Sequence, residues 1–186
     1  TRHIWGGTFH HIGNLILRQH AERVGYRRSF TILDNEDAKD VVELAIKASG
    51  IDTKARMFPK GGVVKELFSY AANTMQAVDE AIRERSPFFY DIADEMTAVH
   101  RIYMEKKRET NAMDFDDLLT YWHRLLAEDE ELRKLYAMTF RHILVDEYQD
   151  TNRIQSEIID FMGLLNRNVM VVGDDAQSIY SFRGAN

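Results

Sequence analysis

The 186-residue chain has no cysteine, only two prolines, and no apolar run approaching the roughly 18 residues of a membrane-spanning helix. The lack of cysteine excludes disulfides, thiolate zinc sites and cysteine nucleophiles, and it suits a reducing compartment. No short apolar stretch follows basic residues at the N-terminus, so no secretory signal is visible. From these absences we expect a soluble, cytoplasmic protein with no membrane partner.

Positive charge is in short supply, because 24 Lys and Arg stand against 30 Asp and Glu, a net charge of −6. This balance argues mildly against nucleic-acid binding, which needs clustered basic residues. The distribution weakens that objection, since residues 1–30 carry a net charge of +4. The apolar share of 45% allows a sizeable core, in one domain or in one domain with an insertion.

The middle third of the chain is helical by pattern with little strand signal, and further helices are expected before and after it. Residues 3–9 are expected to form a short strand or turn, followed by a helix that ends near Gly25. Asp34 should cap a second helix, which Gly50 ends, and residues 51–62 indicate a loop. Helical patterns resume over 63–85 and 88–109. Asp114 should cap a further helix with a buried stripe: Phe115, Leu118, Leu119, Trp122, Leu125 and Leu126.

Two short apolar runs, 143–145 and 169–172, flank a predicted helix over residues 154–165. Strand, helix and strand in this order are typical of the βαβ unit of a buried parallel sheet. The sequence therefore predicts an α/β fold, with the helical block at 31–110 inserted into the α/β domain.

Acidic residues follow the first of these strands. In open α/β sheets, ligands bind outside the carboxyl ends of the strands, where Asp146 and Glu147 are expected. One carboxylate could hold Mg²⁺ through water while its neighbour polarises an attacking water, as nucleotide hydrolysis requires. The alternative is that the acidic residues simply mark where the chain reaches solvent.

The second strand leads into a glycine-containing polar loop. Gly173 permits a sharp turn, and the Gln177 amide could contact a terminal phosphate or an attacking water. Tyr180 and Phe182 are available for base stacking, with burial under the sheet as the alternative.

Four segments together resemble a known family. Val145–Asn152 (VDEYQDTN) and Val172–Ala185 (VGDDAQSIYSFRGA) closely resemble motifs II and III of the UvrD/Rep/PcrA-like superfamily 1 DNA helicases. Trp5–His10 (WGGTFH) resembles the motif with which that family contacts single-stranded DNA. Met113–Leu119 (MDFDDLL) resembles the motif where the chain re-enters the ATPase core. The four segments occur in the family's order and span nearly the whole chain.

The resemblance implies a partial RecA-like P-loop NTPase core with a parallel sheet, interrupted by a mostly α-helical insertion subdomain. Residues 1–30 and 111–186 would belong to the core and residues 31–110 to the insertion. The implied activity is Mg²⁺-dependent ATP hydrolysis coupled to movement on single-stranded DNA, and duplex junctions are further implied partners.

The resemblance also assigns roles to individual residues. Asp146 would coordinate Mg²⁺ through water, Glu147 would be the general base, and Gln177 would sense the γ-phosphate. Arg183 would link the DNA-facing loop to the ATP-facing acids. The residues that would contact single-stranded DNA are Thr8, Phe9, His10, Tyr180 and Phe182. Phe182 would stack on a base where many relatives carry Trp.

One element of the family pattern is missing, because no G-x-x-x-x-G-K-[ST] phosphate-binding loop occurs in the chain. The family places that loop upstream of Thr1 and a second motor domain beyond Asn186. We therefore expect a fragment that lacks parts of its parent chain and is inactive alone. Two alternatives stay open: a non-catalytic helicase-like module that binds DNA or protein, and a part of a helicase–nuclease.

Other polar groups have simpler interpretations. Without cysteine or an HExxH pattern, solvated or DNA-facing side chains are favoured over metal ligands for His3, His10, His11 and His20. First-turn helix stabilisation is favoured over catalysis for Asp114, Asp116 and Asp117. Two interpretations stay open for a basic cluster, which could contact DNA phosphates or form a solvated helix face: Arg101, Lys106, Lys107 and Arg108.

Overall fold

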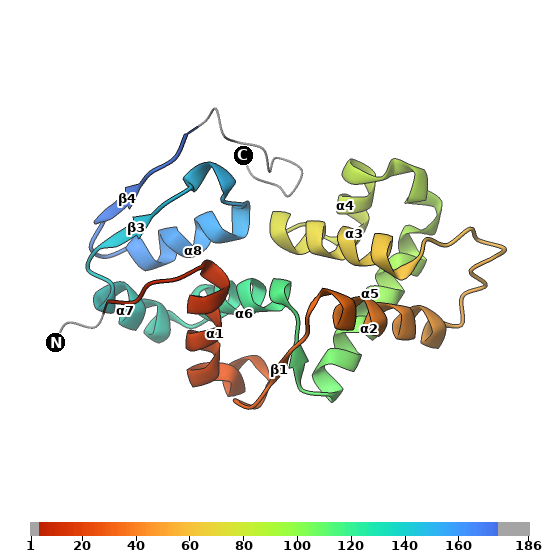
Figure 1. Ribbon diagram of the computed structural model, residues 1–186, viewed down its shortest axis with the longest axis horizontal. Helices are drawn as coiled ribbons and strands as arrows, with labels where there is room; N and C mark the ends of the chain where they lie inside the picture. The colour runs from red at the N-terminus through yellow and green to blue at the C-terminus, as the bar shows by residue number, and fades with distance from the viewer. Residues whose placement is uncertain (1–3, 175–186) are drawn as a thin grey trace. The chain divides into compact units, whose positions relative to one another are not determined.

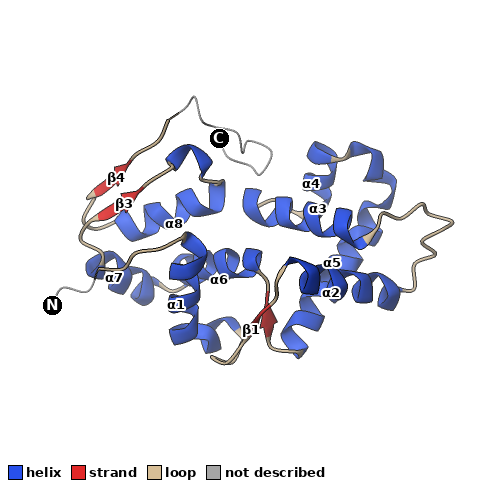
Figure 2. Ribbon diagram, viewed as in Figure 1, coloured by secondary structure: helices blue, strands red, loops and turns tan. Residues whose placement is uncertain are grey.

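The structure is a computed structural model, and it describes residues 4–174. The described part is mostly helical with two small parallel sheets, which is consistent with an α/β fold (Figures 1 and 2). Two compact units make up the chain: the first comprises Thr1–Val24 and Asp117–Asn186, and the second comprises Gly25–Asp116. Within the described range, no helix combines the length and the apolar character needed to cross a membrane.

The second unit holds the helices α2 (Asn35–Ser49), α3 (Gly61–Thr74), α4 (Val78–Arg85) and α5 (Ala93–Glu109), with the 3₁₀ helix η2 (Pro87–Ile92) before α5. The predicted start of α2 is confirmed, because the Asp34 carboxylate accepts the backbone N–H groups of Glu36 and Asp37, both at 2.9 Å. Its predicted end is confirmed as well, because Gly50 adopts the left-handed conformation, with φ of 71°.

The helical pattern predicted over residues 63–85 corresponds to two separate helices, α3 and α4, with a break between them. Met75 adopts a left-handed conformation (φ 57°), and its N–H donates to the carbonyl of Ala72 at 3.2 Å. The N–H of Gln76 donates to Ala71 at 2.9 Å and completes the helix end. The buried residues Ala71 and Val78 lie two helical turns apart, so the apolar period continues in phase across the break and hides it.

A two-stranded parallel sheet in the second unit was not predicted. β1 (Thr31–Ile32) pairs with β2 (Ala112–Met113), with Thr31 opposite Ala112 and Ile32 opposite Met113. Two-residue strands are too short to show an alternating pattern, so only the folded chain reveals this pairing. It joins the two ends of the second unit.

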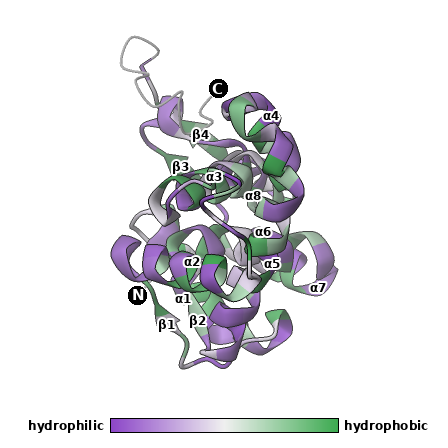
Figure 3. Ribbon diagram, turned by 90° about the vertical axis from the view of Figure 1, so that its right-hand side faces the viewer, coloured by the Kyte–Doolittle hydropathy of each residue, from purple (hydrophilic) through white to green (hydrophobic). Residues whose placement is uncertain are grey.

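The core of the second unit lies between its helices. Figure 3 shows that most helices carry both hydrophobic and hydrophilic residues along their length, as amphipathic helices do. The hydrophobic faces meet in one cluster of buried side chains: Val42, Ala45, Ile46, Phe58, Val64, Leu67, Phe68, Ala71, Val78, Ala81, Ile82, Ile92, Ala93, Met96, Val99 and Tyr103.

The first unit contains α1 (Phe9–His20), the 3₁₀ helices η1 (Ala21–Val24) and η3 (Tyr148–Asp150), α7 (Glu130–Thr139) and α8 (Arg153–Gly163), and most of α6 (Phe115–Glu128). Residues 4–8 form no strand and only bend at Gly7. The predicted buried stripe of α6 is confirmed from Leu118 onward, whereas Phe115 is 43% exposed. The boundary between the units falls in the first turn of α6, so Phe115 precedes the part of α6 that belongs to the first unit.

The strands β3 (Ile143–Val145) and β4 (Val169–Val171) pair in parallel, as predicted, and α8 connects them along the chain. Their predicted burial is wrong, because Leu144 is 69% and Met170 63% exposed, and only Val145 in these strands is buried. In the described residues this sheet has two strands, and both are therefore edge strands. No layer of residues 4–174 covers these apolar side chains.

Candidate functional site

The sheet of the first unit places two polar segments at one end. Asp146 and Glu147 directly follow β3, and both side chains are exposed. The pairing continues beyond the strands, since the Val172 N–H donates to the Val145 carbonyl at 2.8 Å and the Tyr148 N–H donates to the Val172 carbonyl at 2.9 Å. The segment after β4 is therefore joined to the segment that carries the two carboxylates.

Glu147 occupies a left-handed backbone conformation, with φ of 52° and ψ of 43°, which is uncommon for a residue with a side chain. Two hydrogen bonds hold this peptide in place. The Glu147 N–H donates to the Asp146 carboxylate at 3.0 Å, and the Glu147 carbonyl accepts the Asp150 N–H at 2.9 Å. Strained backbone of this kind costs about 1–3 kcal/mol and often marks functional sites.

A residue that sequence reasoning missed contacts this site. Gln149 is buried, and its Nε2 donates to the Glu147 carboxylate at 2.6 Å. Its Oε1 accepts the backbone N–H of Asp174 at 3.0 Å. A Cβ at Gly173 would lie only 2.7 Å from that Oε1, so a glycine is needed for this close approach. The available signal in the sequence was Gln149 shortly after one predicted strand and Gly173 shortly after the other.

The predicted DNA-contacting segment forms the start of α1. Thr8 is the N-cap, and its hydroxyl accepts the His11 N–H at 3.2 Å. Phe9 and His10 are half-buried in the first turn, and the Phe9 ring lies 6.5 Å from the ring of Trp122, between centroids. Four predicted site residues lie outside the described residues: Gln177, Tyr180, Phe182 and Arg183.

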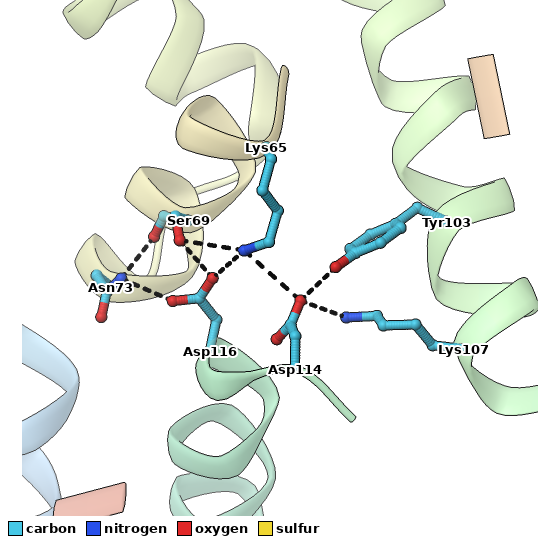
Figure 4. Close-up of polar contacts among 7 residues, drawn as sticks. All are labelled: Lys65, Ser69, Asn73, Tyr103, Lys107, Asp114 and Asp116. Carbon is cyan, nitrogen blue, oxygen red and sulfur yellow. Dashed lines mark hydrogen bonds and ion pairs between the residues drawn. The ribbon is translucent and has the colours of Figure 1, made fainter. Parts of the chain in front are cut away.

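The acidic residues around the start of α6 have partners in the second unit (Figure 4). The Asp114 carboxylate is buried and accepts hydrogen bonds from the hydroxyl of Tyr103 and, at 3.0 Å, from Lys107 Nζ. Lys107 Nζ also lies 4.2 Å from the centre of the Tyr103 ring. Lys107 is only 1% exposed, so the two interpretations of it as a DNA-contacting or solvated residue are both wrong.

Asp116 forms the second half of this cluster. Its carboxylate accepts from Lys65 Nζ at 2.6 Å, from Asn73 Nδ2 at 3.1 Å, and from the hydroxyl of Ser69. Lys65 Nζ also lies 3.6 Å from the Asp114 carboxylate, and it thereby links the two acids (Figure 4). α3 and α5 are thus tied to the residues that begin α6, which indicates a structural role for these acids.

The cluster shifts the pKa of two neighbouring groups. Burial works to lower the pKa of Lys65, but the carboxylates of Asp114 and Asp116 outweigh it and raise that pKa above its usual value. His100 packs against the Phe68 ring, with 4.7 Å between ring centres. Burial lowers the pKa of His100 to about 4, and the charges of Lys107 and Lys65 act in the same direction, against Asp114. His100 is therefore neutral at neutral pH.

A hollow of about 300 Å³ in the first unit is lined by Arg23, Val24, Arg124, Leu125, Glu128, Asp129, Glu130 and Glu131. None of the predicted site residues lines it. Arg23 pairs with Asp129, which also caps α7 by accepting the Leu132 N–H at 3.0 Å. Two polar side chains of the hollow thus belong to an ion pair and a helix cap.

Two exposed carboxylates at the carboxyl end of parallel strands, beside a glycine-containing turn, form the kind of site that nucleotide hydrolases use. The whole chain, residues 1–186, matches the family described as the UvrD/REP helicase N-terminal domain. The chain belongs to this family, and the resemblance seen in its four motifs is confirmed.

Individual relatives support the same assignment. The chain is 36% identical over 185 residues to proteins named ATP-dependent DNA helicase PcrA from Staphylococcus epidermidis (strain ATCC 12228 / FDA PCI 1200) and Staphylococcus aureus (strain NCTC 8325 / PS 47). These matches cover 98% of this chain and 24% of each relative. The chain therefore spans about a quarter of the length of these relatives.

Proposed function

We propose that the chain is part of an ATP-dependent DNA helicase or translocase that couples Mg²⁺-ATP hydrolysis to movement on single-stranded DNA. The observation that carries the proposal is the placement of Asp146 and Glu147 directly after a parallel strand, in a chain of this helicase family. In this proposal, residues 1–30 and 111–186 belong to a RecA-like core, and residues 31–110 form a helical insertion subdomain.

Glu147 is the proposed general base, and it would take a proton from the attacking water. Asp146 is the proposed ligand of Mg²⁺, through water, because carboxylate oxygens are the ligands that this hard cation prefers. Bound Mg²⁺ would supply charge neutralisation at the phosphate oxygens. Both side chains are exposed, so a nucleotide can reach them. Gln177 is proposed to contact the γ-phosphate. Arg183 is proposed to link the two acids to the DNA-contacting residues Tyr180 and Phe182.

Single-stranded DNA is the proposed partner of the start of α1 and of Tyr180 and Phe182. Thr8 caps α1, and Phe9 and His10 stand in its first turn, where the helix dipole favours the negative charge of a phosphate. Tyr180 and Phe182 are proposed to line the same strand through base stacking. Duplex junctions are a further proposed partner.

The isolated chain is proposed to be inactive because it contains no phosphate-binding G-x-x-x-x-G-K-[ST] sequence. Two other functions compete with the motor. A non-catalytic DNA- or protein-binding module would not need a general base, and a helicase–nuclease would use the same ATP site.

The test of this function replaces the proposed base in the full-length protein. Glu147→Gln should slow ATP hydrolysis by about 10²–10⁴-fold, the usual contribution of a general base, and leave ATP affinity nearly intact. Asp146→Asn should instead weaken the Mg²⁺-dependent part of nucleotide binding. Steady-state hydrolysis and nucleotide titration measure the two effects. Hydrolysis at the native rate by Glu147→Gln would contradict the assignment and favour the non-catalytic module.

A further inference from the structure

The Gln149 side chain joins the two segments that leave the sheet. It donates to the Glu147 carboxylate at 2.6 Å and accepts the Asp174 N–H at 3.0 Å. These two contacts require opposite capacities, because a carboxylate only accepts and a backbone N–H only donates. A neutral amide meets both, and its orientation is fixed, since the flipped amide would turn its NH₂ toward the Asp174 N–H.

The surroundings of Gln149 hold this amide in place. The side chain is buried, so the loss of either hydrogen bond would leave a polar group without water as a substitute. Gly173 lacks the Cβ that would approach Oε1 to 2.7 Å. The Tyr148 N–H, which donates to the Val172 carbonyl at 2.9 Å, fixes the backbone on one side of Gln149.

Glu147 also needs a positioning contact. Its backbone is held in a left-handed conformation by Asp146 and Asp150, but these bonds leave the direction of the exposed side chain undetermined. The hydrogen bond from Gln149 Nε2 differs from these backbone contacts, because it is made to the Glu147 carboxylate.

We propose that Gln149 is a positioning residue that holds the carboxylate of Glu147 in its working direction and ties it to the main chain after β4. This inference rests on the proposed role of Glu147 as the base. It adds that the base is placed by an amide whose other end is anchored to Asp174, so the geometry of the base follows the position of that segment.

The experiment measures ATP hydrolysis by the full-length protein carrying Gln149→Met, which keeps the length of the side chain and removes both hydrogen bonds. The kcat should fall by about 10–100-fold, as expected for a misplaced catalytic group, while KM for ATP stays nearly unchanged. The matched control is Gln155→Met. Gln155 accepts the Asn152 N–H at 3.1 Å in the capping box of α8, so its loss should lower the melting temperature and leave kcat unchanged.

A second set of variants keeps the test decisive if Gln149→Met folds poorly. Gln149→Glu places two carboxylates together and should lower the melting temperature. Adding Glu147→Gln to Gln149→Glu again places one donor and one acceptor at positions 147 and 149. The double variant should therefore regain most of the lost melting temperature without regaining turnover. If the double variant melts no higher than Gln149→Glu, the contact between the two side chains is refuted.

Two outcomes separate the inference from the proposed function. If Glu147→Gln hydrolyses ATP at the native rate, the proposed base is wrong, whatever Gln149 does. If Glu147→Gln is slow but a folded Gln149→Met variant keeps the native kcat, or loses only affinity for ATP, the positioning role alone is wrong.

Discussion

Lysines in this chain differ sharply in what their charge contributes. Lys107 is buried against the Asp114 carboxylate at 3.0 Å, whereas Lys134 pairs with Glu130 at 2.6 Å on the surface. A buried charge has lost its hydration, so the removal of one partner leaves the other uncompensated. A surface pair remains solvated and contributes little.

Lys107→Met should therefore lower the free energy of unfolding by about 3–5 kcal/mol, because the Asp114 carboxylate loses its closest cation. Urea denaturation of the chain measures the change. Lys134→Met is the matched control and should leave the midpoint almost unchanged. Lys107→Met combined with Asp114→Leu should recover much of the loss. Equal effects of the two lysine substitutions would contradict the buried pair.

His100 should make the stability of the second unit depend on pH. Its pKa is lowered to about 4 in the folded chain, against a usual value of about 6.5 when the chain is unfolded. Between these two values the unfolded state binds more protons, so stability is complete above about pH 6.5 and falls as the pH drops toward 4. The contribution of His100 is up to about 3 kcal/mol.

The measurement compares unfolding free energies at several pH values between about 7 and 4. Carboxylates also titrate in this range, so the informative quantity is the difference from His100→Gln, which should show a weaker loss of stability. His142→Gln, which changes an exposed histidine of the first unit, is the control for a histidine-to-glutamine substitution itself. Identical curves for the native chain and His100→Gln would disprove the lowered pKa.

At the scale of elements, α3 begins with two glycines that differ in their surroundings. The Gly61 N–H donates to the Glu43 carboxylate at 2.7 Å, and a Cβ at this position would lie 2.6 Å from the same oxygen. A Cβ at Gly62 would meet only the Cδ atom of Lys39, at 4.0 Å. Because the N-cap residue Lys60 makes no side-chain cap, Glu43 from α2 takes that place.

Substitution of the two glycines by alanine should change the free energy of unfolding in opposite directions. Gly62→Ala should stabilise the chain by about 0.5–1 kcal/mol, because alanine loses less backbone freedom on forming a helix. Gly61→Ala should destabilise it by about 1 kcal/mol, the usual cost of losing a helix cap. Thermal unfolding of both variants under the same conditions tests this, and stabilisation by Gly61→Ala would exclude the role of Glu43.

At the scale of the whole molecule, the sheet of the first unit carries apolar side chains that no part of residues 4–174 covers. The large apolar residues of β3 and β4 are exposed together: Leu144, Val169, Met170 and Val171. Contiguous apolar surface on paired edge strands promotes association with other molecules. In the proposed RecA-like core, further strands would pair with these edges and helices on the faces of the sheet would cover the side chains.

The isolated chain should therefore bind a hydrophobic fluorescent dye and self-associate. Leu144→Thr combined with Met170→Thr should reduce dye fluorescence and the apparent mass in light scattering. Leu44→Thr removes an apolar side chain of α2 that is 56% exposed, and it is the control with little expected effect. Undiminished dye binding by the double variant would show that the dye binds elsewhere.

Local features of the fold were predictable from sequence because their causes lie within a few residues. The cap at Asp34 and the helix end at Gly50 each depend on one residue type at one position. The strands β3 and β4 follow from short apolar runs, and the helicase family follows from four ordered motifs. Asp146 and Glu147 could be proposed as site residues because acids after such a strand are a local signal.

The remaining features depended on contacts between distant residues. The break at Met75, the β1–β2 pairing and the burial of Lys107 against Asp114 leave no periodic trace in the sequence. The Gln149 contacts with Glu147 and Asp174 likewise exist only because parallel pairing brings the two strand ends together. Burial and hydrogen bonding between elements depend on which surfaces meet, and sequence periodicity records only which face of an element is apolar.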